Sequence, residues 1–375
     1  MKNKNNLIAG IVIAVLIIAV VLISISPKQE GDEETIEIGF IGPLSGNVAF
    51  LGSIDEKATN LAVEEINNKG GVNGKQLEVV FQDGKCTGEG GLSAANKLIN
   101  FDNINILLVS CGQEVLTVAP IAEENQVILF ATYATHPDIS NLGDFIFRNS
   151  YSDTDIAEIA TDTIIKKHKK IGLISEQTDY TIGLRDAFKV KFEESEGVII
   201  EEYFESGSTD FKTELLKLIN LDAIFINPSG LAQGELILKQ LEELNYNGDL
   251  YGNYFGGSNK IQQIEKAQDM IYFSDPTSTN NEKKKQYFTK YKTTYQELPD
   301  LEFPAVARYD AVYILVQAID SCNSDDPDCI RDYLYDLENF EGVLGNYSFD
   351  ENGDLEGIQP SVNIIKNKEA VKYEK

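Results

Sequence analysis

The feature that most constrains the fold is an alternation of short apolar runs with longer amphipathic segments, which extends from residue 35 to about residue 273. Several short runs are apolar at nearly every position, as in residues 104–109 (INILLV) and 223–226 (AIFI). Strands that are covered on both faces need this composition, and the alternation with helices makes their sheet parallel. Right-handed crossovers between parallel strands then predict a doubly wound α/β fold.

The alternation is too long for one sheet of ordinary width, and 375 residues exceed a single core. We therefore expect two lobes, with a break near the polar stretch 149–153. Strands are expected at residues 36–41, 77–82, 104–110, 127–132, 171–175, 198–204, 223–227, 250–253 and 270–273. Helices are expected at residues 53–69, 91–101, 113–124, 153–167, 182–196, 209–218 and 233–244.

The N-terminus carries an uncharged apolar run that begins at Leu7 and ends at Ile25. This run is just long enough to span a bilayer as a helix, and the Lys residues before it and the acids after it place everything downstream outside the cytoplasm. A cleaved signal peptide is the alternative, because Ser24 and Ser26 resemble a cleavage site. We assign residues 1–26 to a membrane anchor or signal and residues 27–34 to an acidic linker, so the protein is expected at the cell membrane or, after cleavage, as a secreted domain.

The charge balance excludes several functional classes. The chain has 32 Lys and Arg against 60 Asp and Glu, a net charge of −28, which disfavours binding to nucleic acid. Only two His are present, and there is no Gly-x-Ser-x-Gly nucleophile motif. His168 lies in a basic run at a predicted helix end, and His136 precedes a proline. We expect no enzymatic activity, no metal and no cofactor.

The four cysteines form two local pairs. Cys86 and Cys111 each follow a predicted strand, and adjacent parallel strands would bring them to the same sheet edge within bridging distance. Cys322 and Cys329 bracket a turn-rich loop. Zinc binding is the alternative, but neither pair is accompanied by Cys-x-x-Cys or by paired His. In an exported protein, structural disulfides are the better interpretation.

A set of motifs resembles the type I periplasmic solute-binding proteins, above all the leucine/isoleucine/valine-binding branch that feeds ABC transporters. The resemblance runs from about residue 35 to about residue 365. It is carried by residues 38–46 (IGFIGPLSG), 61–67 (LAVEEIN), 70–75 (GGVNGK), 133–137 (YATHP), 309–312 (YDAV) and 349–355 (FDENGDL).

The resemblance implies a function and a domain arrangement. Two lobes joined by a three-strand hinge would close on a small amino-acid-like ligand (an amino acid, small carboxylate or amide) and deliver it to an ABC permease. The first lobe would be residues 35–152 plus 278–342, and the second residues 153–277 plus 343–375. A ligand-sensing receptor ectodomain acting with a separate signalling partner is the alternative function. We expect a monomer.

The predicted ligand site lies beyond the carboxyl ends of the strands, where helix N-termini attract anions. By resemblance, the ligand carboxylate would be held by Gly112, beside Gln113, and by the N–H and hydroxyl of Thr135, beside Tyr133 and Ala134. Tyr180 matches a tyrosine that meets the ligand from the second lobe.

The sequence departs from the branched-chain pattern where specificity is set. Tyr254 replaces a glutamate that receives the ligand ammonium, Ser229 replaces a tyrosine, and Leu51, beside Phe50, replaces a tryptophan. A cationic amine would then need Asp310, Asp179, Glu176 or the faces of Tyr254 and Tyr133. The ligand is therefore open between an amino acid with altered contacts and a small carboxylate or amide without an ammonium.

Overall fold

The computed structural model describes residues 35–274 and 282–374. The predicted anchor or signal and the acidic linker, residues 1–34, lie outside these ranges. Within the described ranges, no helix combines the length and apolar character needed to cross a bilayer.

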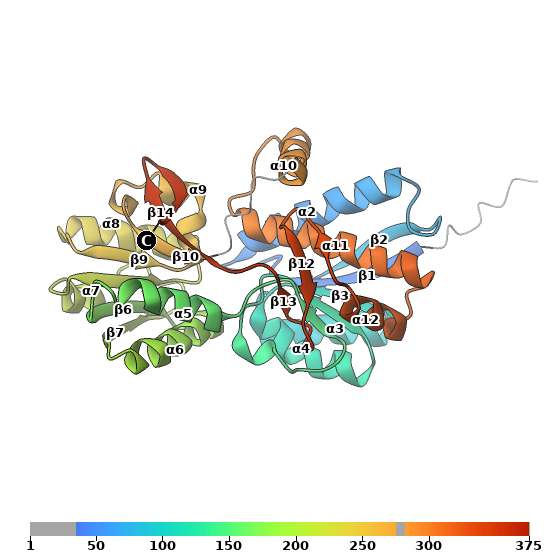
Figure 1. Ribbon diagram of the computed structural model, residues 1–375, viewed down its shortest axis with the longest axis horizontal. Coiled ribbons are helices and arrows are strands. Elements are labelled where there is room, and N and C mark those ends of the chain that lie inside the picture. The colour runs from blue at the N-terminus through green and yellow to red at the C-terminus, as the bar shows by residue number, and fades with distance from the viewer. Residues whose placement is uncertain (1–34, 275–281, 375) are drawn as a thin grey trace, which may run out of the picture.

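Two lobes, each built on its own sheet, lie end to end along the long axis of the molecule (Figure 1). The sheet of the first lobe is parallel, with strand order β2-β1-β3-β4-β5. Its strands are β1 (Thr35–Gly42), β2 (Gln76–Asp83), β3 (Ile106–Val109), β4 (Ile128–Ala131) and β5 (Ile146–Arg148). The chain winds outward from β1 in both directions, as the strand–helix alternation predicts.

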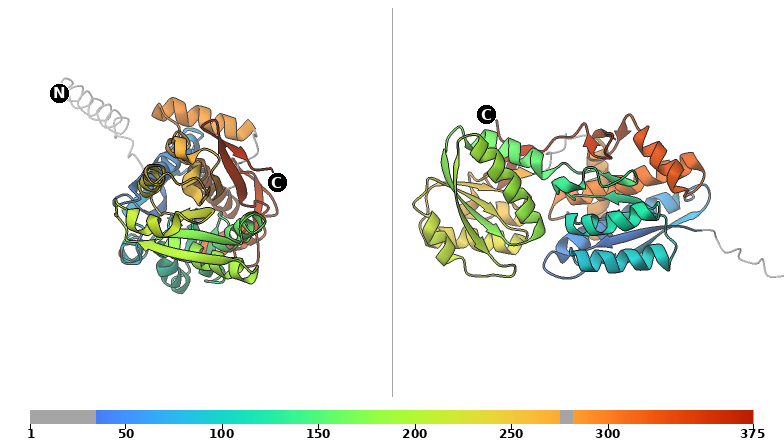
Figure 2. Two further views of the ribbon diagram at one scale, coloured as in Figure 1. Left: turned by 90° about the vertical axis from the view of Figure 1, so that its left-hand side faces the viewer. Right: turned by 90° about the horizontal axis from the view of Figure 1, so that it is seen from below.

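Helices cover both faces of this sheet (Figure 2). They are α2 (Ala49–Asn68), α3 (Gly88–Asn100), α4 (Gly112–Glu124), α11 (Glu302–Cys322) and α12 (Pro327–Tyr335). A further helix, α10 (Glu282–Tyr295), packs outside them, where the Tyr287 hydroxyl donates to the carbonyl of Ala305 in α11. Because side chains alternate along a strand, Ile106 and Leu108 pack into one core cluster with α2 and α11. Leu107 and Val109 pack into a second cluster with α3 and α4.

The sheet of the second lobe has the order β15-β14-β10-β9-β8-β6-β7. Its strands are β6 (Lys170–Glu176), β7 (Val198–Phe204), β8 (Ala223–Asn227), β9 (Asp249–Gly252), β10 (Ile271–Ser274), β14 (Ser361–Lys366) and β15 (Glu369–Lys372). Its helices are α5 (Asp153–Ile164), α6 (Asp179–Glu194), α7 (Lys212–Leu218), α8 (Leu231–Glu243) and α9 (Asn259–Gln262). The sheet is parallel from β7 to β10, whereas β14 and β15 run antiparallel. The strands expected from the sequence are thus parallel, and β14 and β15, which were not expected, add an antiparallel edge.

A small antiparallel sheet of β11 (Phe340–Glu341), β12 (Asn346–Phe349) and β13 (Leu355–Glu356) packs on the first lobe. The ring of Phe349 lies 5.7 Å from that of Phe130 and 5.6 Å from that of Phe147. The sequence analysis predicts that the chain crosses back into the second lobe at residue 343. Because these buried aromatic residues complete the first core, the chain instead reaches the second sheet only at β14.

Both predicted cysteine pairs are bonded, which confirms the disulfide interpretation. The Cα atoms are 5.3 Å apart in Cys86–Cys111 and 6.0 Å apart in Cys322–Cys329. The strands that precede the first pair are not adjacent, since β1 lies between β2 and β3. The loop after β2 therefore crosses the end of β1 to reach Cys111, and the N–H of Gly84 donates to the carbonyl of Gly42 on the way.

Candidate functional site

A cavity of about 390 Å³ lies between the lobes. Most of its wall consists of loops and helix starts that follow the carboxyl ends of strands in both sheets, which is where open α/β sheets bind ligands, and α11 adds Phe303 and Pro304. The first lobe contributes Asn47, Val48, Leu51, Lys85, Cys86, Thr87, Cys111, Gly112, Gln113, Tyr133, Thr135, His136, Tyr151, Phe303 and Pro304. The second lobe contributes Asp153, Thr178, Asp179, Tyr180, Ser206, Ser229 and Tyr254.

Most of the sequence-predicted site residues come together in this wall: Leu51, Gly112, Gln113, Tyr133, Thr135, Tyr180, Ser229 and Tyr254. Three others do not line the cavity. Phe50 packs against the core of the first lobe. Ala134 is buried, and its carbonyl accepts hydrogen bonds from Ser150 and Arg148. Asp310 is buried and accepts the N–H groups of the segment between β11 and β12.

Of the other two acidic residues that were predicted to bind an ammonium, one lines the cavity and one does not. Asp179 lines the cavity from the start of α6 and is exposed. Glu176 is buried and does not line the cavity, and its Oε2 accepts the N–H of Ser229 at 2.8 Å. Tyr254 donates its hydroxyl proton to the carbonyl of Ser229, so this phenol already serves the second-lobe loop.

The carboxylate that sequence reasoning missed is Asp153, the first residue of α5. Its side chain is only 1% exposed, it lines the cavity, and its Oδ2 has no hydrogen-bond partner within the described residues. Burial raises the pKa of Asp153 to about 7, although a hydrogen bond from the Thr135 side chain and the charge of Arg148 oppose this. The available signal was its position, directly after the predicted lobe boundary and at a helix start.

The start of α4 supplies hydrogen-bond donors to the cavity, whereas Asp153 supplies an acceptor. The first N–H groups of a helix have no intrahelical partners, and those of Gly112 and Gln113 belong to residues of the cavity wall. The helix dipole adds partial positive charge there. A Cβ atom on Gly112 would lie 3.3 Å from the Cβ of His136, so the glycine keeps this end of the helix close to the neighbouring loop.

Aromatic side chains form the rest of the wall. In the second lobe, the rings of Tyr180 and Tyr254 meet edge to face with centroids 5.6 Å apart. In the first lobe, the rings of Tyr151 and Phe303 are 5.8 Å apart. Together with Leu51, these rings offer an apolar surface to the body of a ligand.

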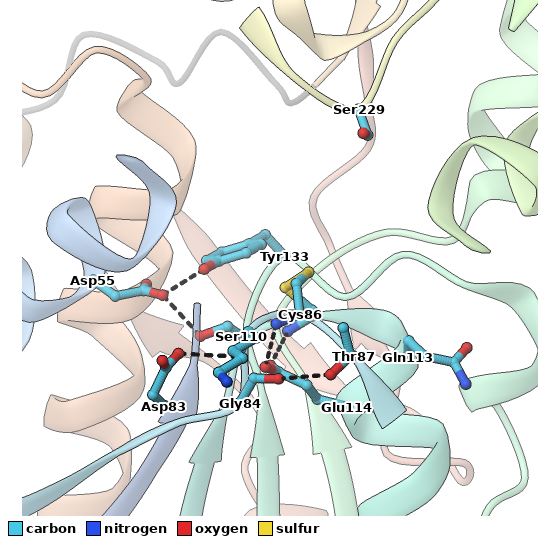
Figure 3. The surroundings of a disulfide bond; sticks show 12 residues. Asp55, Asp83, Gly84, Cys86, Thr87, Ser110, Gln113, Glu114, Tyr133 and Ser229 are labelled. Carbon is cyan, nitrogen blue, oxygen red and sulfur yellow. Dashed lines mark hydrogen bonds between the residues drawn. A yellow bond between two sulfur atoms is a disulfide. The ribbon is translucent and has the colours of Figure 1, made fainter. Parts of the chain in front are cut away.

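A buried polar cluster supports Tyr133 from behind (Figure 3). The Tyr133 hydroxyl donates to Asp55 Oδ2, which also accepts from Ser110 Oγ at 2.8 Å. Arg308 donates from Nε to Asp55 Oδ1 at 3.1 Å and from Nη2 to Ser110 at 2.9 Å. Tyr133 has a φ of 44°, a left-handed conformation that is rare for a large side chain. The cluster therefore anchors the hydroxyl end of a tyrosine whose backbone has this uncommon conformation.

A hydrogen bond between two side chains links the lobes at the cavity wall: Asn47 Nδ2 donates to Ser206 Oγ at 3.0 Å. Both residues are exposed, so the bond should contribute about 0.5–1 kcal/mol. We expect Asn47→Ala to speed ligand release about two- to sixfold. Ser206→Ala should do the same, and the double variant should be no faster than either single one. Stopped-flow measurement of ligand release tests this, and additive effects in the double variant would show that the two side chains are not coupled.

Comparison with known proteins places this arrangement in context. A family model described as periplasmic binding protein matches residues 35–362. Leu/Ile/Val-binding protein homolog 3 from Brucella melitensis is 31% identical over 343 residues, which cover 88% of this chain and 91% of the relative. A leucine-, isoleucine-, valine-, threonine- and alanine-binding protein from Pseudomonas aeruginosa is 27% identical over 337 residues, 88% of this chain and 89% of the relative.

A solved structure matches at a similar level. It is the branched-chain amino acid transporter substrate binding protein LivJ from Streptococcus pneumoniae in complex with isoleucine. The TM-score is 0.80 and the identity 26%, over 91% of this chain and 100% of that one. The similarity thus covers both lobes and the cavity between them.

Proposed function

The chain belongs to the periplasmic binding protein family, and we propose that it captures a small amino acid between its lobes for delivery to an ABC permease. Its relatives are solute-binding proteins, in agreement with the expectation of a chain that is not an enzyme. The shape and polarity of the cavity support this ligand class, as does the similarity to binding proteins for leucine, isoleucine and valine.

The observation that carries the proposal is the pairing of unlike polar groups in one cavity wall. The N–H groups at the start of α4 suit a carboxylate, and the Asp153 carboxyl, with one oxygen unpartnered within the described part of the chain, suits an ammonium. A zwitterionic amino acid carries both groups on one carbon. Its side chain would then lie against the aromatic rings of Tyr151, Tyr180, Tyr254 and Phe303.

The proposed role of Asp153 would compensate for the absence of a glutamate at position 254. The phenol of Tyr254 donates to Ser229, so Asp153 is the better acceptor for the ammonium. Asp179, which is exposed, would add a longer-range attraction. Thr135 would contribute its N–H to the ligand while its hydroxyl orients Asp153.

A thermal-shift screen of the purified protein tests the function. At a concentration one hundred times its Kd, a ligand stabilises the folded state by about 2.7 kcal/mol, or a few degrees in Tm for a chain of this size. We expect shifts with one or more of the twenty amino acids and none with the matching decarboxylated amines or des-amino acids. Shifts with the des-amino acids alone would identify a carboxylate-binding protein instead.

The membrane attachment and the oligomeric state remain parts of the proposal. The uncharged run from Leu7 to Ile25 supports a retained single-pass anchor with the lobes outside the cytoplasm. Fractionation of cells and N-terminal sequencing distinguish an anchored chain, which starts at residue 1 or 2, from a secreted one that starts near residue 27. We propose a monomer, to be checked by light scattering in detergent.

A further inference from the structure

Glu114, the third residue of α4, lies directly behind the Cys86–Cys111 disulfide and is fully buried. Its Oε1 accepts the N–H of Cys86 at 2.8 Å, and its Oε2 accepts the N–H of Cys111 at 3.1 Å (Figure 3). One carboxylate therefore joins the loop after β2 to the loop after β3, beside the covalent bond between the same two residues.

Two glycines leave the space that the Glu114 side chain occupies. A Cβ atom on Gly84 would lie 2.2 Å from Glu114 Oε1, and one on Gly91 would lie 3.1 Å from the Cα of Glu114. Any larger residue at these positions would displace the carboxylate or the loop.

The loop that Glu114 holds is strained. Lys85 and Cys86 are consecutive non-glycine residues with φ values of 57° and 59°. Such conformations persist only where the surrounding structure enforces them. The disulfide restrains the Cys86 side chain, but the hydrogen bond to Glu114 is what fixes the direction of the Cys86 peptide group.

The two restrained loops are cavity wall. Lys85, Cys86 and Thr87 line the cavity on one side of the disulfide, and Cys111, Gly112 and Gln113 line it on the other. We propose that Glu114 is a positioning residue that sets the geometry of these two loops, and with it the site for the ligand carboxylate. The effect of Glu114 on ligand binding rests on the proposed function. Its effect on the conformation of the two loops does not.

The protonation of Glu114 gives the positioning a pH dependence. Burial raises the pKa of Glu114 to about 7, against the two N–H bonds, with Asp55 raising it further and Arg308 lowering it. The neighbouring loop also carries Asp83, which accepts the N–H of Lys85, and the Lys85 ammonium. A protonated carboxyl keeps a hydroxyl that donates, so it can no longer accept both N–H groups equally well.

Asp310 provides a matched control. It is another buried carboxyl of the first lobe that accepts two backbone N–H groups, those of Val343 and Leu344, both at 2.8 Å. Burial also raises its pKa to about 7. It does not line the cavity, so Asp310→Asn removes the same chemistry from a different place.

The test is hydrogen exchange of the ligand-free, full-length protein, corrected for intrinsic rates, in peptides that cover residues 84–90 and 110–116. In the wild type, protection should rise about tenfold from pH 6 to pH 8. Glu114→Gln should lose about tenfold of protection at pH 8 and show no such rise, whereas Asp310→Asn should behave as the wild type does. An unchanged profile in Glu114→Gln, or an equal loss in Asp310→Asn, would overturn the proposal. If Glu114→Gln does not fold, the wild-type pH profile decides alone.

A second readout uses L-leucine as the probe, by calorimetry at pH 8. Glu114→Gln should bind it about tenfold more weakly than the wild type, and Asp310→Asn should bind it equally well. Equal affinity in wild type and Glu114→Gln would contradict the positioning role at the ligand site. A wild type that binds no amino acid would refute the proposed function, while the exchange experiment would still decide the role of Glu114.

Discussion

Asp153→Asn should weaken the binding of an amino acid by about 2–5 kcal/mol, roughly thirty-fold to several-thousand-fold. The carboxylate is buried and would be the partner of a buried ammonium, so its loss leaves a cation in the cavity without a counter-charge. Asp179→Asn is the matched control, because this carboxylate lines the same cavity but is exposed. It should cost less than tenfold. Calorimetry with the amino acid found by the screen measures both.

The same residue should make capture depend on pH. Because the pKa of Asp153 is raised to about 7, the ligand-free protein holds a proton there below that pH. Only the ionised form attracts the ammonium, so affinity should fall about tenfold for each pH unit below 7. Asp153→Asn should make this dependence much shallower. If Asp153→Asn binds like the wild type at pH 8, the ammonium lies elsewhere and the proposed ligand orientation is wrong.

Arg308→Met should lower the free energy of unfolding by about 3–5 kcal/mol. Arg308 and Asp55 are both fully buried, and removal of the guanidinium leaves the carboxylate without its counter-charge. The arginine also lies over the ring of Phe40, 5.0 Å from its centroid, so packing is lost with the charge. Urea unfolding followed by circular dichroism gives the value.

Two further variants separate charge from packing. Asp55→Asn/Arg308→Met removes both charges and should recover part of the loss, because no buried ion remains unpaired. Lys290→Met breaks the partly exposed pair between Lys290 and Glu65 and should cost less than about 1 kcal/mol. A loss in Arg308→Met no larger than that in Lys290→Met would show that the buried pair contributes little.

Nine of the twelve strands in the two described sheets could be predicted from sequence because their signal is local, whereas β5, β14 and β15 were not predicted. Residues of β3 and β8 are buried at every position, so their apolar runs are continuous and short. α11 gave no such signal, since it is buried around most of its surface and carries Arg308 and Asp310 in its middle. A helix that is buried on most sides shows no amphipathic period from which it could be predicted. The partners of its charged residues, Asp55 and the segment after β11, are also distant in the sequence.

The candidate site divides in the same way. Gly112, Thr135 and Tyr180 follow strand ends in sequence, so their convergence could be predicted. Asp310 was placed near the ligand because it falls within a family motif, yet the structure uses its carboxylate to hold the backbone after β11. The proposed role of Asp153 depends on a buried oxygen that has no hydrogen-bond donor among the described residues. Burial and hydrogen bonding are set by the folded structure, so the sequence alone does not reveal them.

The antiparallel pairing of β14 with β10 has a consequence for how the chain is made. The second sheet is composed of a segment that ends at Ser274 and a segment that begins at Ser361, with much of the first lobe encoded between them. When the chain is synthesised from its N-terminus onward, the β10 edge therefore stays unpaired until β14 has also been made. An open strand edge is a template for intermolecular pairing, so the growing second lobe should be prone to aggregation until β14 covers that edge. A chain that stops just before β14 should accordingly aggregate, whereas the full-length chain should remain in solution.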